Sequence, residues 1–250
     1  MKVTNLTKNM QRYFAIDKKE ELLVLNADDY HHIFNVLRLN KTDKIEVVYD
    51  GFLYCCTAEI INSVGFQYIS SSKLVDNEYK LTFLLATSKS DKLELVIQKV
   101  TEICAASYIV YNSKRSVSIW TKDKFQNKKT RFEKIIKEAC EQSKQHVIPT
   151  INFVNKLNEI NFDSYDLKLI AYEKENEKNL IKQSIIKEAK NILVVIGPEG
   201  GFDEGEVEDF INKGFISVSL GNSILRCETA PIYTASIISY FKELTDEKNL

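Results

Sequence analysis

Glycine is concentrated in one stretch of this chain, where special backbone conformations could bind a ligand. Six of the eight glycines lie between Gly197 and Gly221. The first cluster is the run Ile196-Gly197-Pro198-Glu199-Gly200-Gly201, which connects a predicted strand to a predicted helix that Asp203 and Glu206 can cap. Glycine permits positive φ and close backbone approach, so the N–H and C=O groups of such a turn can recognise the edge of a ligand such as adenine.

A second turn of the same kind follows the next predicted strand. Residues 220–230 read Leu-Gly-Asn-Ser-Ile-Leu-Arg-Cys-Glu-Thr-Ala and lead into a predicted helix that runs to about Glu243. The carboxyl ends of parallel strands meet at one edge of a sheet, where ligands bind, so the two turns predict a single pocket. A merely tight connection between strand and helix is the alternative interpretation of each turn taken alone.

Two common nucleotide-binding motifs are missing from the sequence. It contains no G-x-x-x-x-G-K-[ST] phosphate loop and no G-x-G-x-x-G after a first strand. These absences argue against a standard nucleoside-triphosphate site and against a nucleotide-binding oxidoreductase. With these two ligand classes excluded, a different cofactor that carries a nucleoside is the ligand that we expect in the pocket.

The elements that would position this pocket alternate between apolar strands and amphipathic helices from Leu81 onward. Such alternation predicts an α/β domain with a parallel sheet flanked by helices. Two helices are expected around residues 93–104 and 132–143, each with one apolar face, and the second also carries a basic face. The expected strands are 81–86, 108–111, 167–172, 192–196 and 216–220.

The chain before residue 75 has a different pattern, with short runs of β-branched and aromatic residues that predict a small β-barrel. The expected strands are 21–25, 44–49, 53–61 and 66–70, and Asp50-Gly51 predicts a tight hairpin because such a turn needs positive φ. One helix is expected at 28–39 and a linker at 71–79. We therefore expect a barrel domain in residues 1–75 and an α/β domain in residues 76–250.

The composition, 44% hydrophobic and 28% charged, is typical of a folded soluble protein. No run approaches 18 consecutive apolar residues and the first ten residues lack the apolar centre of a secretory signal, so we expect a cytoplasmic protein without a membrane partner. The five cysteines form no C-x-x-C pair and there are only three histidines, so we expect neither disulfides nor a metal site.

The net charge of −1 hides a local excess of positive charge. Between Lys114 and Lys144 there are ten Lys or Arg and four Asp or Glu, an excess of six, so the rest of the chain sums to −7. This segment is a candidate surface for RNA. A solvated helix face whose charge serves only solubility is the alternative.

Several motifs, taken together and in order, resemble the RsmE family, the bacterial 16S rRNA uridine-N3 methyltransferases of the SPOUT class. The most specific are residues 197–202 (Gly-Pro-Glu-Gly-Gly-Phe), Leu220-Gly221 and residues 224–230 (Ile-Leu-Arg-Cys-Glu-Thr-Ala). The resemblance extends from about residue 10 to 240. Further matches are residues 12–14, His32 with 36–39, and residues 89–92, 98–102, 115–117 and 138–143.

This resemblance implies a PUA-like RNA-binding β-barrel followed by a SPOUT-type α/β domain whose C-terminal part forms a trefoil knot. It also implies a homodimer that binds S-adenosylmethionine in the knot loops and acts on 16S rRNA of the small ribosomal subunit. The cofactor contacts that it implies are Leu85, Ala86, Glu173, Gly197, Gly200, Leu220, Gly221, Ile224, Leu225 and Thr229.

Arg226 is the residue that we expect to serve the chemistry. Uracil N3 is a poor nucleophile until its proton leaves, and a guanidinium can stabilise the negative charge that then spreads onto the flanking carbonyl oxygens. Glu199 or Glu228 could accept the proton or only hold the arginine, and the sequence does not identify the base. A purely structural role of Arg226, as partner of a backbone carbonyl, is the alternative.

Five basic residues are candidates for contacts with RNA phosphates: Arg12, Arg38, Lys89, Arg115 and Lys144. Each alone is more often a solvated surface charge.

The sequence departs from the family pattern in three places. After Thr101-Glu102 the chain continues as Ile-Cys-Ala, where the family usually has a glycine-containing turn. Lys144-Gln145-His146 stands where the family commonly has an arginine, so the charge is kept but the bidentate guanidinium is lost. Residues 1–9 precede Met10, where the resemblance to the family's start begins.

Two further interpretations stay open. One is a related SPOUT methyltransferase that acts on tRNA or on a ribose hydroxyl, against which the N-terminal barrel and the Gly-Pro-Glu-Gly-Gly turn argue. The other is a nonenzymatic RNA-binding or ribosome-assembly factor, which would predict loss of the glycines or of Arg226, and both are present.

Overall fold

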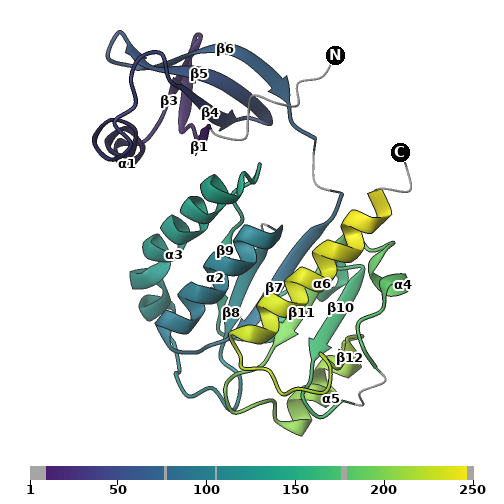
Figure 1. Ribbon diagram of the computed structural model, residues 1–250. Coiled ribbons are helices and arrows are strands. Elements are labelled where there is room, and N and C mark those ends of the chain that lie inside the picture. Colours follow the sequence, from purple (N-terminus) through teal and green to yellow (C-terminus); the bar gives the residue numbers. More distant parts are fainter. Residues whose placement is uncertain (1–9, 76–77, 105, 176–178, 247–250) are drawn as a thin grey trace. The chain divides into compact units, whose positions relative to one another are not determined.

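The computed structural model of the chain describes residues 10–75, 78–104, 106–175 and 179–246 (Figure 1). Residues 1–9, which precede the start that resembles the family, lie outside them. The described residues divide into two compact units. The first holds the residues up to 75 together with Glu141–His146, and the second holds the rest. No described helix has the length and apolar character needed to cross a membrane.

The first unit is a curled six-stranded sheet with the strand order β1-β4-β5-β6-β3-β2. Among the described strands of this unit, the β1–β4 pair is parallel and the other pairs are antiparallel. The two residues between β1 and β2 close the sheet, because the N–H of Ala15 donates to Val48 O and that of Ile16 to Val24 O. The strands are β1 (Gln11–Phe14), β2 (Asp17–Lys19), β3 (Leu22–Val24), β4 (Lys44–Tyr49), β5 (Phe52–Ile61) and β6 (Gly65–Lys73).

The predicted hairpin at Asp50-Gly51 is confirmed. The two residues have φ of 45° and 73° and join β4 to β5, which pair antiparallel from Lys44 with Thr57 to Tyr49 with Phe52. The buried interior of this unit includes Tyr13, Ile45 and Phe66. The barrel core is therefore built from inward side chains of several strands.

Two predictions for the first unit differ from the structure. The expected helix 28–39 is a short helix α1 (Ala27–His31), capped by Asn26, followed by a wider π turn (His32–Val36). Its end is set by Arg38, which has the left-handed φ of 54°. The expected linker 71–79 was also wrong in its first part, because β6 continues to Lys73 in antiparallel pairing with β5.

The second unit is an α/β layer structure around a parallel six-stranded sheet with the order β12-β10-β11-β7-β8-β9. The five predicted strands are confirmed within one or two residues. They are β7 (Lys80–Ala86), β8 (Ser107–Tyr111), β10 (Leu167–Ala171), β11 (Asn191–Ile196) and β12 (Ile216–Val218). An edge strand, β9 (Ile151–Val154), was not predicted.

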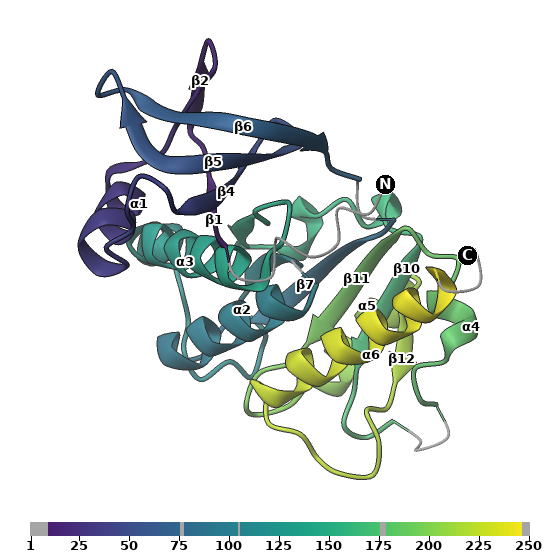
Figure 2. The same ribbon diagram turned by 45° about the horizontal axis from the view of Figure 1, so that its top comes forward.

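Helices cover both faces of this sheet. The helices α2 (Ser90–Cys104) and α6 (Thr229–Asp246) lie side by side across one face (Figures 1 and 2). On the other face, Val207 and Phe210 of α5 (Glu204–Asn212) pack with Leu84, Leu193 and other strand residues. The remaining helices are α3 (Lys122–Ser143), α4 (Gln183–Ile186) and two short 3-10 turns, Leu157–Glu159 and Phe162–Ser164.

This topology brings the ends of several strands together. In a parallel sheet all carboxyl ends lie at one edge, so the segments after β7, β10, β11 and β12 start from the same edge. These segments include both predicted glycine-rich turns. The sheet therefore positions a site from residues that are far apart in the sequence.

Candidate functional site

A cavity of about 610 Å³ lies at the carboxyl edge of the second unit's sheet. Three segments line most of it: residues 171–175 after β10, residues 196–202 after β11, and residues 219–227 after β12. Lys92 of α2 and Ala230 of α6 complete the lining. The prediction that the two glycine-rich turns form one pocket is confirmed.

The first turn is fixed by the N-terminus of α5. Asp203 caps this helix through the N–H of Gly205, and Glu206 accepts a hydrogen bond from the N–H of Asp203, so the predicted capping box is confirmed. Lys114 Nζ lies 3.1 Å from the Asp203 carboxylate, and this hydrogen bond lowers the pKa of Asp203. The turn therefore ends in a stabilised helix start.

Glycine is required in this turn because other groups lie directly against its backbone. Gly201 has a φ of 67°, and a Cβ there would collide with the carboxylate of Glu173 from the segment after β10. A Cβ at Gly197 would come within 2.9 Å of the ring of Phe202. The left-handed φ of Gly201 and the close Phe202 ring at Gly197 therefore favour glycine at both positions, and the Glu173 carboxylate lies in the space that Gly201 leaves open.

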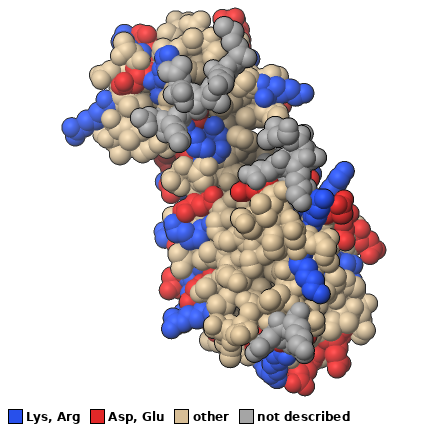
Figure 3. Space-filling view, turned by 45° about the vertical axis from the view of Figure 1, so that its right-hand side comes forward, with Lys and Arg blue, Asp and Glu red and all other residues tan. Residues whose placement is uncertain are grey.

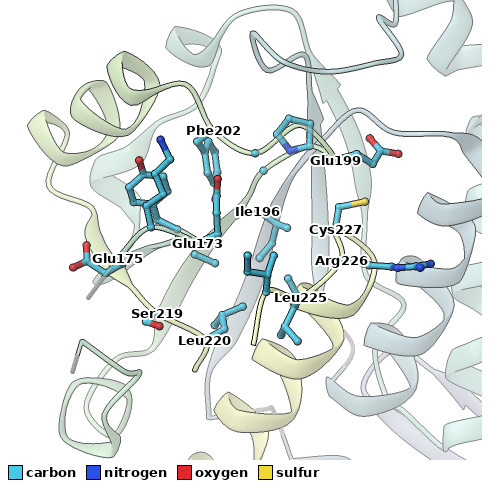
Figure 4. A pocket seen from close by; sticks show the side chains of 18 of the residues that line it. Glu173, Glu175, Ile196, Glu199, Phe202, Ser219, Leu220, Leu225, Arg226 and Cys227 are labelled. Carbon is cyan, nitrogen blue, oxygen red and sulfur yellow. The ribbon is translucent and has the colours of Figure 1, made fainter. Parts of the chain in front are cut away.

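The lining is apolar at its centre and charged on one side. Ile196, Leu220 and Leu225 lie at the centre of the close-up, and Glu199, Cys227 and Arg226 lie together on one side (Figure 4). Glu173 lies on the opposite side of the centre, near Phe202 (Figure 4). The cavity therefore offers an apolar floor between two polar ends, as ligand sites commonly do.

Lys92 connects two of the predicted catalytic carboxylates. Its Nζ lies 3.4 Å from Glu199 Oε1 and 3.4 Å from Glu228 Oε2. The Cys227 thiol donates to the same Glu228 oxygen at 3.2 Å. All four side chains are partly buried, so the cluster is a defined ionic arrangement at the wall of the cavity rather than a set of solvated charges.

Burial and the hydrogen bond to Glu228 raise the pKa of Cys227 to about 12, so its thiol keeps the proton that it donates. Burial by itself raises the pKa of Glu228, but the hydrogen bond from Cys227 and the charge of Lys92 outweigh burial and the pKa is lowered. Partial burial likewise acts to lower the pKa of Lys92, and the neighbouring Cys227 and carboxylates reverse the direction. The cluster therefore holds an ammonium ion on Lys92 and an ionised carboxylate on Glu228 at neutral pH.

Most of the predicted cofactor residues lie in the cavity lining. These are Glu173, Gly197, Gly200, Leu220, Gly221, Ile224 and Leu225. Leu85, Ala86 and Glu228 instead line a second, very small cavity of about 10 Å³ that shares Lys92 and Cys227 with the first. Thr229 lines neither; it begins α6, and its N–H donates to Arg226 O.

Arg226 lies at the rim of the cavity, and its side chain points away from the apolar centre (Figure 4). Within the described part of the chain its guanidinium makes no hydrogen bond or ion pair with another residue. This differs from the alternative in which Arg226 holds a backbone carbonyl. The guanidinium is left available to a group that approaches the rim from outside.

The five predicted RNA contacts fall into two groups. Arg38, Lys89 and Arg115 are exposed. Arg12 is only 4% exposed, forms a 2.8 Å ion pair with Glu46, and also donates to the backbone oxygens of Lys144 and Gln145. Lys144 Nζ lies 3.1 Å from the same Glu46 carboxylate. Arg12 and Lys144 are therefore engaged within the first unit, unlike a side chain that is free to meet a phosphate.

Part of the basic segment 114–144 is also paired with nearby acids. Arg131 forms two 2.7 Å hydrogen bonds with Glu94, and Lys122 lies 3.5 Å from Glu159. Arg115 differs, because its one ion pair among the described residues, with Asp203, is 3.5 Å long. Its backbone packs against Gly200 of the cavity turn. Arg115 is the basic residue of this segment that lies beside the cavity.

Lys92 was not among the predicted site residues, although it belongs to the segment 89–92 that resembles the family. Tyr172, Phe202 and Cys227 of the lining were not predicted either. A signal for Lys92 was present, because the residue lies in the first turn of the helix that follows β7, at the same sheet edge as the glycine turns. Nothing in the sequence showed which carboxylates it would meet.

Two family models match the chain. A model described as an RNA methyltransferase domain matches residues 75–239, and one described as an RNA methyltransferase PUA domain matches residues 25–62. The Bacillus subtilis (strain 168) protein named ribosomal RNA small subunit methyltransferase E is 33% identical over 251 residues, which cover 94% of this chain and 98% of that protein.

Solved structures share the fold. A crystal structure described as that of a hypothetical protein has a TM-score of 0.79 at 32% identity and covers 94% of this chain and 99% of its own. The ribosomal RNA small subunit methyltransferase E of Neisseria gonorrhoeae, crystallised with S-adenosyl methionine, has a TM-score of 0.78 at 22% identity and covers 93% and 98%. The α/β architecture with its N-terminal barrel is thus shared along nearly the whole chain.

Proposed function

Because the chain belongs to the RNA methyltransferase family of the ribosomal RNA small subunit methyltransferases E, we propose that it methylates N3 of a uridine in 16S rRNA, with S-adenosylmethionine as the methyl donor. The observation that carries the proposal is the cavity at the carboxyl edge of the sheet, with Arg226 and two carboxylates at its charged side. The family membership supports methyl transfer to RNA. The residues that line the cavity support the assignment of the cofactor and catalytic residues.

The cavity fits the cofactor in size and in chemistry. A volume of about 610 Å³ lies within the usual range for small-molecule sites. The glycine turn exposes backbone N–H and C=O groups that suit an adenine edge, the apolar centre suits the ring face, and Glu173 offers a carboxylate for hydroxyl or ammonium groups. We propose that Glu173, Gly197, Gly200, Leu220, Gly221, Ile224 and Leu225 hold the cofactor, with Leu85, Ala86 and Thr229 supporting the site from behind.

When bound, S-adenosylmethionine supplies a methyl group on a sulfonium sulfur, which keeps the electron pair of the broken bond. The protein must supply a nucleophilic nitrogen in line with that methyl group. In this proposal Arg226 at the rim binds the uracil through a carbonyl oxygen and stabilises the charge that forms as the N3 proton leaves. Glu199 or Glu228 receives that proton.

RNA recognition is assigned to the exposed basic residues Arg38, Lys89 and Arg115. Phosphate contacts of this kind add affinity that depends strongly on salt. Arg115 lies beside the cavity turn, so it is suited to the phosphates that flank the target nucleotide. For Arg12 and Lys144 we propose a structural role in the first unit instead, because Glu46 and backbone oxygens already occupy them.

We further propose that the enzyme acts as a homodimer on the small ribosomal subunit in the cytoplasm. The second unit carries a broad surface without charge on the face that Figure 3 shows. Tyr233 and Tyr240 of α6 are 44% and 59% exposed, and Ile224 at the cavity is 84% exposed. Exposed apolar side chains of this number are suited to a second copy of the chain, which would cover them beside the cofactor site. A trefoil knot in the cavity loops remains a prediction.

The test is to incubate the protein with methyl-labelled S-adenosylmethionine and small ribosomal subunits that lack the modification, then to digest the rRNA and identify the labelled nucleoside. We expect N3-methyluridine in one fragment. Arg226→Ala should lower kcat by about 100-fold or more while cofactor affinity changes little, because the residue stabilises charge only in the transition state. The kcat of Arg226→Lys should lie between those of the wild type and Arg226→Ala, since lysine keeps the positive charge but lacks the bidentate guanidinium.

The outcomes separate the remaining candidates. Label in tRNA or in a ribose-methylated nucleoside would contradict the proposed uridine-N3 substrate and indicate the substrate of a related SPOUT methyltransferase. Cofactor binding without any labelled RNA would support the assignment of the cavity as the cofactor site and contradict the proposed RNA substrate. Absence of cofactor binding by calorimetry would favour a nonenzymatic ribosome-assembly factor.

A further inference from the structure

Within the proposed methyl transfer, on which this inference rests, we propose that Lys92 is a positioning residue: anchored by Glu228, it orients the Glu199 carboxylate to accept the N3 proton of the target uracil. The transfer of the methyl group releases one proton. That proton passes from the uracil nitrogen to a Glu199 oxygen, and the nitrogen keeps the electron pair that attacks the methyl carbon.

The two carboxylates of the cluster are not equivalent, and their positions assign the roles. Glu199 lines the large cavity, whereas Glu228 lines only the small cavity behind it. Glu228 is the more buried of the two, with 15% of its side chain exposed against 23% for Glu199. Glu228 also accepts the Cys227 thiol at 3.2 Å. Glu228 is therefore the fixed anchor, and Glu199 is the carboxylate that a substrate can reach.

Lys92 is placed to act through Glu199 rather than on the substrate. Its ammonium lies 3.4 Å from each carboxylate and 4.0 Å from the Cys227 sulfur, so its donors are directed at protein groups. Glu199, Cys227 and Arg226 lie on the same side of the cavity (Figure 4). A base on Glu199 and a cation on Arg226 would thus face the same part of the uracil, one for the proton and one for the charge.

The groups that face Glu199 come from two elements. They are Lys92 from α2, and Cys227 and Glu228 from the loop before α6, while Glu199 itself follows β11. Lys92 is the cation among them that contacts Glu199 directly. Its removal leaves two carboxylates near each other without the charge between them, which favours protonation of one. The pKa of Glu199 should therefore rise when Lys92 is replaced by an apolar residue of similar length.

The experiment compares Lys92→Met with the wild type in pH–rate profiles of single-turnover methyl transfer. A base must be ionised, so activity falls on the acid side as Glu199 takes up a proton. We expect Lys92→Met to lower kcat about tenfold and to move this acid limb upward by about one pH unit. The KM for the cofactor should change less than threefold. In Lys92→Arg the acid limb of the pH–rate profile should lie at its wild-type pH, because arginine again places a positive charge beside Glu199.

A second measurement does not depend on activity. In cofactor-free protein with carbon-13-labelled glutamate carboxyls, the pKa of Glu199 should be higher in Lys92→Met than in wild type, with Glu199→Gln used to assign the resonance. Glu228→Gln provides a second variant should Lys92→Met fail to fold. It releases Lys92 from its anchor, so it should lower kcat and leave the Glu199 signal in place.

The matched control is Lys99→Met. Lys99 lies on the same helix and pairs with Glu102 at 2.8 Å outside the cavity, so its loss should leave both kcat and the pH profile unchanged. An unmoved acid limb and an unmoved Glu199 pKa in Lys92→Met would overturn the inference. Loss of cofactor affinity with an unchanged pH profile would do the same, because it would place Lys92 at the cofactor. If wild-type protein methylates no RNA, the proposed function itself fails, whatever the glutamate titration shows.

Discussion

Arg12 illustrates how a residue that the sequence presents as a surface charge can serve the interior. Its guanidinium pairs with Glu46, and the exposed fractions of the two side chains are 5% and 1%. Burial and the nearby Arg12 charge lower the pKa of His146, so its neutral ring can accept the hydrogen bond from Arg12 at 3.0 Å. Arg12 thereby joins β1 to the Glu141–His146 segment within the first unit.

We expect Arg12→Met to destabilise the protein by about 3–5 kcal/mol, because it leaves the Glu46 carboxylate buried without its main partner. The double variant Arg12→Met/Glu46→Leu should recover most of the loss, since no buried charge is left. Urea unfolding followed by the fluorescence of barrel tyrosines and by circular dichroism measures both effects.

Lys41→Met is the control for this pair. Lys41 forms an exposed ion pair with Glu59 at 2.7 Å, and such pairs contribute little to stability. If Arg12→Met instead kept the wild-type stability and weakened RNA binding with a shallower salt dependence, Arg12 would be an RNA contact after all.

At the scale of elements, Glu206 of α5 connects two loops at the site. Its carboxylate accepts hydrogen bonds from Ser113 Oγ at 3.0 Å, from the Lys114 N–H at 2.9 Å and from the Asp203 N–H at 3.2 Å. The first two donors belong to the loop after β8, and the third belongs to the turn after β11. One buried carboxylate thus fixes the Arg115 loop against the glycine turn.

Glu206→Ala should lower the free energy of unfolding by about 2–3 kcal/mol, since it strands several buried donors at once. It should also increase hydrogen exchange in residues 113–120 and in the turn at 197–203 together. Chemical denaturation and exchange measured by mass spectrometry check the two parts. Glu208→Ala, an exposed neighbour on the same helix, should change neither; exchange that rises in only one of the two segments would show that Glu206 does not couple them.

At the scale of the whole molecule, the two units carry separate tasks on one chain. The cavity that we propose for the cofactor is lined by residues of the second unit, while the first unit is a closed barrel with its own core. Ligand that binds only the folded state stabilises it by about 2.7 kcal/mol at 100 times its Kd. The unfolding transition of the second unit should therefore respond to the cofactor.

We expect saturating S-adenosylmethionine to raise Tm by about 5–10 °C, given about 2–4 °C per kcal/mol for chains of this size. Differential scanning calorimetry with and without cofactor measures the shift. Gly201→Val should abolish it, because a β-branched residue is strained at a φ of 67° and its Cβ would displace the Glu173 carboxylate from the turn. Gly51→Val is the matched control: its φ of 73° imposes similar strain in the barrel hairpin with open space around it, so it should lower Tm and keep the cofactor shift. An equal shift in both variants would place the cofactor elsewhere.

The sequence by itself determined the local features. Asp50-Gly51 specified a hairpin, Asp203 and Glu206 specified a helix start, and the apolar runs specified five strands of the second sheet, because each of these depends on neighbours within a few residues. It also determined the pocket in outline, since parallel strands place their following turns at one edge. The weakly apolar strands β1 and β2 and the edge strand β9 escaped detection because tertiary pairing, not their own pattern, holds them in the sheets.

Only the tertiary structure decided which charges meet. Lys92 joins Glu199 and Glu228 across more than a hundred residues of sequence, Arg12 is buried against Glu46, and Arg226 is left at the rim without a partner among the described residues. A charged residue has no periodic signature that reveals its partner. Its burial and pKa depend on groups brought together by the packing of distant elements, which is why the arrangement of the site required the folded chain.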